Sequence, residues 1–173
     1  VDGRENIYVW GNDRNMQAKL PDDIYNHGNI VQIEAGYQMT LAVTDQNYVF
    51  TWGNENLNDT YADAESSFQG KVVKVAATND SAIGLTVDGE VVHVGLAEKA
   101  ISNIPAEALT GVVDIAAANQ NVAALKEDGT VLVWGNASKG EQNIPEFSSK
   151  PVKIYGGSYH YVALLEDGSV TAW

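Results

Sequence analysis

A tripeptide, Trp-Gly-Asn, recurs at a nearly fixed interval along the chain. It begins at Trp10, Trp52 and Trp134, a degraded Val-Gly-Leu copy begins at Val94, and Trp173 closes the series. Successive positions are 42, 42, 40 and 39 residues apart. A constant period of this size indicates one repeated supersecondary unit whose copies bury one another. We therefore look for function on a face built from equivalent loops, and not in one catalytic cluster.

Each unit carries a turn six residues before its Trp position. The residues between turn and Trp alternate in polarity, as in a half-buried β-strand. Three turns are Asp-Gly, which tolerates the positive φ of a tight hairpin, and one is Gln-Asn, a weaker version of the same solution. The four turns are Gln46-Asn47, Asp88-Gly89, Asp128-Gly129 and Asp167-Gly168.

Two more apolar runs precede each turn and predict two further strands. We expect their anchor side chains to be buried at equivalent places in every unit. The first strand is anchored by Ile33, Val75, Ile115 and Ile154, and the second by Val43, Leu85, Leu125 and Leu164. The segment Asn6–Trp10 matches the place of a third strand and is also predicted as one. No stretch shows a sustained helical period, so helix is expected only as a turn or two in the long loops.

Short strands repeated at one fixed period predict an all-β fold of β-propeller type, in which each unit is one blade. We expect a single domain over residues 1–173, with a partial unit at about 1–10. Four units follow at about 11–52, 53–94, 95–134 and 135–173. The Asp-Gly hairpins should lie on one rim, and the loops between first and second strands on the other.

One stretch of the third unit carries a family resemblance. Residues 115–135 read IAAANQNVAALKEDGTVLVWG, which resembles the repeat of the regulator of chromosome condensation superfamily. The nearest wording is that of repeats of the β-lactamase inhibitory protein II type, which the ending Gln142–Pro145 also matches. The family's loop His survives only at His160. Propellers of this family usually have seven blades, so the resemblance implies an arc of about four blades from a larger propeller.

The loops between first and second strands carry the most variable side chains. Equivalent loops of a propeller gather on one face, and tyrosine is favoured in binding hot spots because it joins an apolar body to a polar tip. These loops give our predicted partner-binding residues, although ordinary exposed turn residues are the alternative. The residues are Tyr37, Gln38, Asp80, Gln120, Tyr159 and His160.

Two tryptophans have a second interpretation. In the inhibitor-like relatives, aromatics near the Trp-Gly turn contact the partner, so the resemblance implies this role for Trp52 and Trp134. The alternative is that each indole packs between neighbouring blades. His160 is likewise open to a structural, hydrogen-bonded role, which we favour over a catalytic one.

Composition excludes several classes of function. The chain has no Cys, and its three His fall at non-equivalent repeat positions, so no metal site, cofactor or catalytic residue is predicted. A formal net charge of −13 argues against a nucleic-acid partner, which needs clustered Lys and Arg. The apolar runs are too short to insert into a membrane.

These observations predict a non-catalytic binding propeller that engages a protein or a glycan. We expect it outside a cell, at the cell surface or on a virion. One alternative is a secreted inhibitor of an enzyme such as a β-lactamase. Another is a structural segment that is covered by additional blades, by self-association or by a larger assembly.

Overall fold

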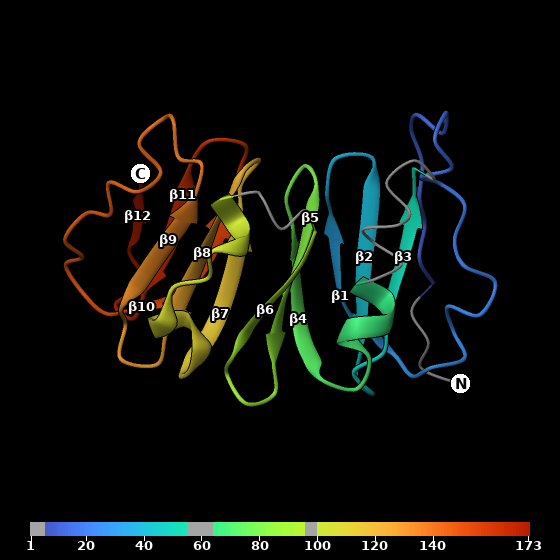
Figure 1. Cartoon of the computed structure of the whole chain (residues 1–173), viewed down its shortest axis with the longest axis horizontal. Coiled ribbons are helices and arrows are strands. Elements are labelled where there is room, and N and C mark those ends of the chain that lie inside the picture. Colours follow the sequence, from blue (N-terminus) through green and yellow to red (C-terminus); the bar gives the residue numbers. More distant parts are fainter. Residues whose placement is uncertain (1–5, 55–63, 96–99) are drawn as a thin grey trace.

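A computed structural model describes residues 6–54, 64–95 and 100–173, and within these residues it has four three-stranded antiparallel sheets (Figure 1). We call the sheets blades one to four. Blade one holds β1 (Ile30–Ala35), β2 (Met39–Thr44) and β3 (Val49–Gly53), and blade two holds β4 (Val72–Ala77), β5 (Ser81–Thr86) and β6 (Val91–Gly95). Blade three holds β7 (Val112–Ala117), β8 (Asn121–Lys126) and β9 (Val131–Gly135), and blade four holds β10 (Pro151–Gly156), β11 (Tyr161–Leu165) and β12 (Val170–Ala172).

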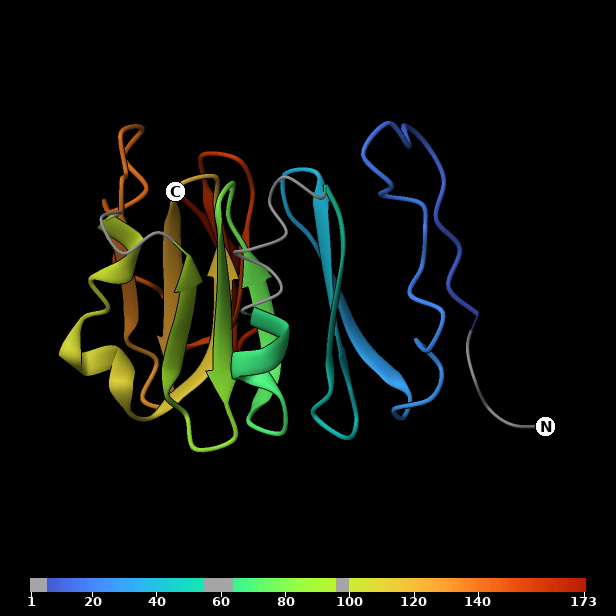
Figure 2. The ribbon, with the colours of Figure 1, turned by 45° about the vertical axis from the view of Figure 1, so that its right-hand side comes forward.

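All four blades share one strand register. The anchor residue of each first strand lies opposite the residue just before the anchor of the second strand, as in Ile33 with Ala42 and Ile115 with Ala124. Each first strand also has a bulge at its second residue. The blades follow one another in chain order, with blade four and the N-terminal segment at opposite ends (Figures 1 and 2). The predicted all-β fold with four propeller blades in an open arc is confirmed.

The hairpins between second and third strands share one turn geometry. Asn47, Gly89, Gly129 and Gly168 all have positive φ, at 58°, 78°, 91° and 85°. In each turn this residue donates its N–H to the carbonyl three positions earlier, as in Gly129 to Lys126 at 2.9 Å. This is a type I turn closed by a residue in the left-handed region, where Gly and Asn cost least. The hairpins that follow β2 and β5 lie on the rim opposite the loops that precede these strands (Figure 1).

The apolar core lies between blades, because strand side chains alternate between the two neighbours. Leu41, Val43 and Val49 of blade one form one buried cluster with Val72 and Val75 of blade two. Equivalent clusters join blades two and three and blades three and four.

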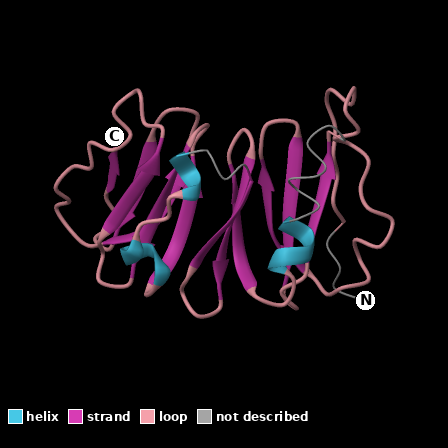
Figure 3. Ribbon diagram, viewed as in Figure 1, coloured by secondary structure: helices cyan, strands magenta, loops and turns pink. Residues whose placement is uncertain are grey.

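Helix is confined to the long loops (Figure 3). Short helical turns occur at residues 64–68, in η2 (Ala100–Ser102) and in η3 (Ala106–Leu109). Phe68, Ile101 and Ala108 from these turns enter the cores between blades. The expectation of at most a turn or two of helix is therefore confirmed for the described residues.

Two predicted anchors are not buried as expected. Ile33 is 46% exposed, whereas the equivalent Val75, Ile115 and Ile154 are at most 1% exposed. Leu164 is half-buried, in contrast to its fully packed counterparts. Ile33 points away from blade two, and Leu164 points away from blade three. Each residue sits on the outer face of an end blade, so it lacks the neighbour that covers its counterparts.

The predicted strand at Asn6–Trp10 is also wrong. These residues pair with no strand in the described part of the chain. Ile7 nevertheless packs against Ala42, Phe50 and Trp52 of blade one. Residues 6–10 thus lie beside blade one, in the place of the third strand of a preceding blade. Among the described residues no second strand lies next to them, so they form no ladder of backbone hydrogen bonds.

Candidate functional site

The loops between first and second strands of all four blades surround one hollow of about 360 Å³. We call it the loop hollow. Its wall consists mainly of small residues and exposed backbone, together with Glu34 and Tyr37. Backbone hydrogen bonds link the loops of blades two, three and four in series, since Asn79 N–H donates to Asn119 O at 2.9 Å and Asn119 N–H to Ser158 O at 3.1 Å. The hollow is thus built by the arc as a whole, and no single blade could form it.

The Trp-Gly-Asn motif holds these loops in place. Nδ2 of Asn54 donates to Oε1 of Gln38 at 2.6 Å, and Nδ2 of Asn136 donates to Oε1 of Gln120 at 2.9 Å. The Asn backbone N–H groups bond the same glutamines' carbonyls at 2.9 Å. The preceding glycine is required by this close approach, because a Cβ on Gly135 would lie 2.6 Å from Gln120 O.

Sequence reasoning treated Gln38 and Gln120 as partner-binding residues and missed this role. The amide–amide contacts engage the ends of both side chains with the fold's own motif. A signal was present, because Gln and Asn stand sixteen residues apart in both blades. Blade two, whose motif is degraded, has Asp80 in place of the glutamine.

Of the remaining loop candidates, Tyr37 lines the hollow. The others, Asp80, Tyr159 and His160, lie in the same set of loops, one or two residues after Asn79 or Ser158, which also line it. Tyr37 is 60% exposed and Tyr159 is 55% exposed. His160 is exposed and Asp80 is partly buried. Tyr37 lies in the loop from β1 to β2 and Tyr159 in the loop from β10 to β11, so blades one and four each present one ring from the loop that joins their first two strands.

The two candidate tryptophans lie in the core. Trp52 is 7% exposed and Trp134 is 6% exposed. Each buried indole donates its Nε1–H to a carbonyl of the long loop that leads into its own blade, and Trp173 does the same. The bonds run from Trp52 to Gln17, from Trp134 to Ile101 and from Trp173 to Glu141, at 2.9, 2.9 and 2.8 Å. The packing interpretation therefore describes Trp52 and Trp134, which have little surface to offer a partner.

Charged side chains of blades one to three interact with one another, beginning with Glu34 in the wall of the loop hollow. Burial raises the pKa of the Glu34 carboxyl, and the nearby Lys74 ammonium partly opposes this shift. Lys74 also pairs with Asp114 of blade three. The other carboxylate oxygen of Asp114 accepts the N–H of Ile154 in blade four at 3.0 Å. Asp114 thus ties three blades together, which is a structural role.

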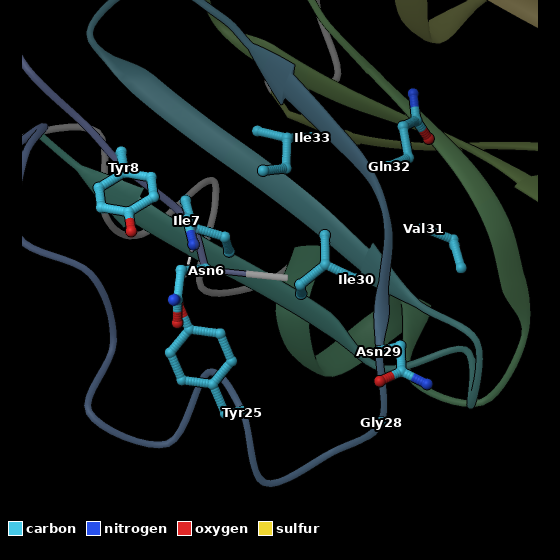
Figure 4. Close-up of a pocket in the computed structure, with 10 residues that line it drawn as sticks. All are labelled: Asn6, Ile7, Tyr8, Tyr25, Gly28, Asn29, Ile30, Val31, Gln32 and Ile33. Atoms are coloured by element: carbon cyan, nitrogen blue, oxygen red, sulfur yellow. Dashed lines mark hydrogen bonds between the residues drawn. The ribbon is translucent and has the colours of Figure 1, made fainter. Parts of the chain in front are cut away.

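A second concave region lies beside blade one, between residues 6–8 and β1 (Figure 4). We call this cleft of about 710 Å³ the leading cleft. Tyr25 and residues 28–33 complete its wall, and Ile7 N–H is held by the Tyr25 hydroxyl at 2.9 Å. Its lining is a mixture of aliphatic side chains and backbone.

Within residues 6–54, 64–95 and 100–173, neither region brings together a set of metal-ligating side chains or a pair of carboxylates. Among the described residues no group of three or more His, Asp or Glu side chains is placed to hold a metal ion. Glu34 is the sole carboxylate among the described residues that line the loop hollow, whereas glycosidic chemistry needs a carboxyl pair. No helix in the described part of the chain is long and apolar enough to cross a membrane. The loop hollow is suited to hydrogen bonding and aromatic contact.

Comparison with known proteins gives one consistent result. The model of the regulator of chromosome condensation (RCC1) repeat matches residues 30–58. The human Regulator of chromosome condensation is 28% identical over 102 residues, which cover 51% of this chain and 24% of that protein. The chain therefore matches about a quarter of the length of this curated relative.

Solved structures show the same fold. Human WBSCR16 superposes with a TM-score of 0.63 at 20% identity, covering 84% of this chain and 48% of that one. Prp20p of Saccharomyces cerevisiae, whose binding to Gsp1p and histones has been characterised, gives a TM-score of 0.61 at 21% identity and covers 88% and 45%. The chain thus spans about half of each, and the likeness is one of fold.

Proposed function

Because this chain is built from repeats of the regulator of chromosome condensation type, we propose that it is a non-catalytic, protein-binding propeller. The partner contacts the rim of the loop hollow. One observation carries the proposal: four equivalent loops, fixed by Gln–Asn and backbone hydrogen bonds, surround a hollow beside two exposed tyrosines. Rigid aromatic side chains are the residues that dominate binding energy at protein interfaces.

The partner's chemistry follows from charge. A chain with a formal net charge of −13 attracts a basic protein surface and repels an acidic one. Prp20p, one of the solved structures that share this fold, has been characterised for its binding to Gsp1p and histones. We therefore propose a partner with a basic face, whose recognition depends on Tyr37 and Tyr159. Display outside a cell or on a virion is a further part of this proposal.

The test measures binding of core histones, as a basic probe, to the immobilised chain. The double variant Tyr37→Ser, Tyr159→Ser should weaken binding at least about tenfold, because a lost aromatic hot spot costs roughly 2 kcal/mol. Neither substitution changes net charge, so non-specific attraction stays constant. Tyr8→Ser is the matched control, since Tyr8 is 76% exposed but lines the leading cleft.

Further arms separate the alternatives. Histone binding that the double variant leaves unchanged contradicts the proposal. Binding of a glycan panel that depends on the two tyrosines would make the partner a glycan. Tyrosine-dependent binding of a class A β-lactamase would favour the inhibitor, a role that so far stays a prediction from the family resemblance.

A further inference from the structure

The two ends of the arc carry apolar faces that match. The leading face, on blade one, holds Ile30, Ile33 and Ala35, of which Ile33 and Ala35 are exposed. The trailing face, on blade four, holds Val162, Leu164 and Val170, with Val170 62% exposed. Residues at the same repeat positions also occur within the chain, where the trailing face of one blade packs against the leading face of the next.

The interface between blades one and two provides the template. There Leu41, Val43 and Val49 form the trailing face of blade one, at the repeat positions of Val162, Leu164 and Val170. Their partners Val72, Val75 and Ala77 form the leading face of blade two, at the positions of Ile30, Ile33 and Ala35. All six template residues belong to one buried cluster.

We propose that the trailing face of one copy of this chain docks on the leading face of a second copy. The occupant of the leading cleft is therefore blade four of that second copy, placed as blade one is placed on blade two. Such a head-to-tail contact joins different patches of the two copies, so it either closes into a ring or runs on. This inference concerns assembly and is independent of the proposed partner.

Ring closure with two copies fits the size of the arc. The chain spans 48% and 45% of the solved chains it superposes on, so two copies together have about the length of one of those chains. Eight blades also lie within the range that propellers adopt. In a closed pair both leading faces and both trailing faces are buried, and the loops of both copies surround one larger hollow.

Residues 6–10 must move for this docking. Ile7 lies three residues before a Trp position, as Val49 and Val170 do, so β12 of the incoming copy requires its place. β12 is paired with β11 at three positions and is followed by Trp173, which is anchored by its indole. Residues 6–10 pair with no strand among the described residues, and Tyr8 and Trp10 are 76% and 86% exposed. The less firmly held segment is displaced.

Sedimentation equilibrium of the full chain tests the proposal. We expect a dimer of twice 18.6 kDa, favoured by salt because two chains of charge −13 repel each other. Ile33→Lys and Leu164→Lys should each weaken association at least about tenfold, since each places a charge in an apolar interface. Val113→Lys is the control, because Val113 is 52% exposed on blade three and lies on neither end face. Circular dichroism establishes that each variant is folded.

A mixture of the two variants distinguishes this head-to-tail contact from a symmetric dimer in which both copies use the same face. Ile33→Lys keeps an intact trailing face and Leu164→Lys an intact leading face, so an equimolar mixture should recover a dimer that neither forms alone. Ile7→Asp should tighten association several-fold, because it loosens the competing segment. If Leu164→Lys fails to fold, Val170→Lys replaces it at an exposed position of the same face. A wild-type monomer in high salt, or a mixture that stays monomeric, overturns the proposal and assigns these faces to another protein or to further repeats.

Discussion

The phenol of Tyr161 in blade four donates a hydrogen bond to Oδ1 of Asn121 in blade three, at 2.5 Å between two buried side chains. Asn121 also donates its Nδ2–H to Asn136 O at 3.0 Å. The bond between these two residues therefore couples the packing of two blades to the turn that holds one loop of the hollow.

Replacing Tyr161 by Phe should lower the free energy of unfolding by about 1–3 kcal/mol. The substitution removes only the hydroxyl, but it leaves Oδ1 of Asn121 buried without its donor. Urea denaturation measures the loss. Tyr155→Phe is the control, because Tyr155 is 52% exposed and should change stability by no more than about 0.5 kcal/mol. Equal effects of the two variants would show that the buried bond contributes nothing.

The same phenol predicts a pH dependence. Burial raises the pKa of Tyr161 well above its ordinary value of 10.0, so the folded chain keeps this proton when the unfolded chain releases it. Its contribution to stability is complete below about pH 10 and falls as pH rises further. The stability difference between wild type and Tyr161→Phe should therefore shrink between about pH 9 and pH 11. A difference that is constant over this range contradicts the assignment.

Asp114→Ala should lower the free energy of unfolding by about 1–3 kcal/mol. The substitution leaves the buried Ile154 N–H without an acceptor and Lys74 without its ion-pair partner. Lys74→Met should cost less, since that side chain is 31% exposed and the backbone bonds of Asp114 persist. Lys153→Met, at the equivalent place of blade four, is the control and should be nearly neutral. The measurement is chemical denaturation, and a neutral Asp114→Ala would refute the role of this carboxylate between blades.

Leu125→Ala should cost about 2–5 kcal/mol, because the side chain is 1% exposed between blades three and four and its removal leaves a cavity. Leu164→Ala makes the same substitution at the equivalent position of the half-buried end face. Its cost in the monomer should be well below that of Leu125→Ala. Similar losses in thermal and chemical denaturation at low protein concentration would mean that the trailing face is covered.

Two turn variants measure how much the positive φ of the turn residue contributes to stability. Gly168→Ala should cost about 1–2 kcal/mol, since φ is 85° there and an added Cβ meets nothing within 4 Å, which leaves only the conformational penalty. Asn47→Gly, at the equivalent position with φ 58°, should stabilise by a few tenths of a kcal/mol. Melting temperatures measured by calorimetry check both signs. A stabilising Gly168→Ala would show that this turn has another conformation in solution.

The sequence alone predicted the four blades, the strand types and the positive φ of the turn residues. These features are local, because a strand alternates its side chains with a period of two and a tight turn restricts φ whatever surrounds it. Tyr37 and Tyr159 lie in loops between first and second strands, as the repeat predicted, since equivalent positions of a repeat occupy equivalent places. Their role in binding stays a prediction. The strand predicted at Asn6–Trp10 was wrong because a β-strand also needs a neighbouring strand to pair with, and the local pattern does not show whether one is present.

The repeat pattern shows which residues are equivalent, whereas the packing of the blades sets what each of them contacts. Ile33 and Val75 hold the same repeat position, yet 46% of the first is exposed and none of the second, because blade one has no full blade before it. The contact between Lys74, Asp114 and Ile154 joins residues forty positions apart, one from each of three blades. Burial depends on the neighbouring blade across the interface, and the repeat pattern alone does not show which blades have a neighbour on both sides.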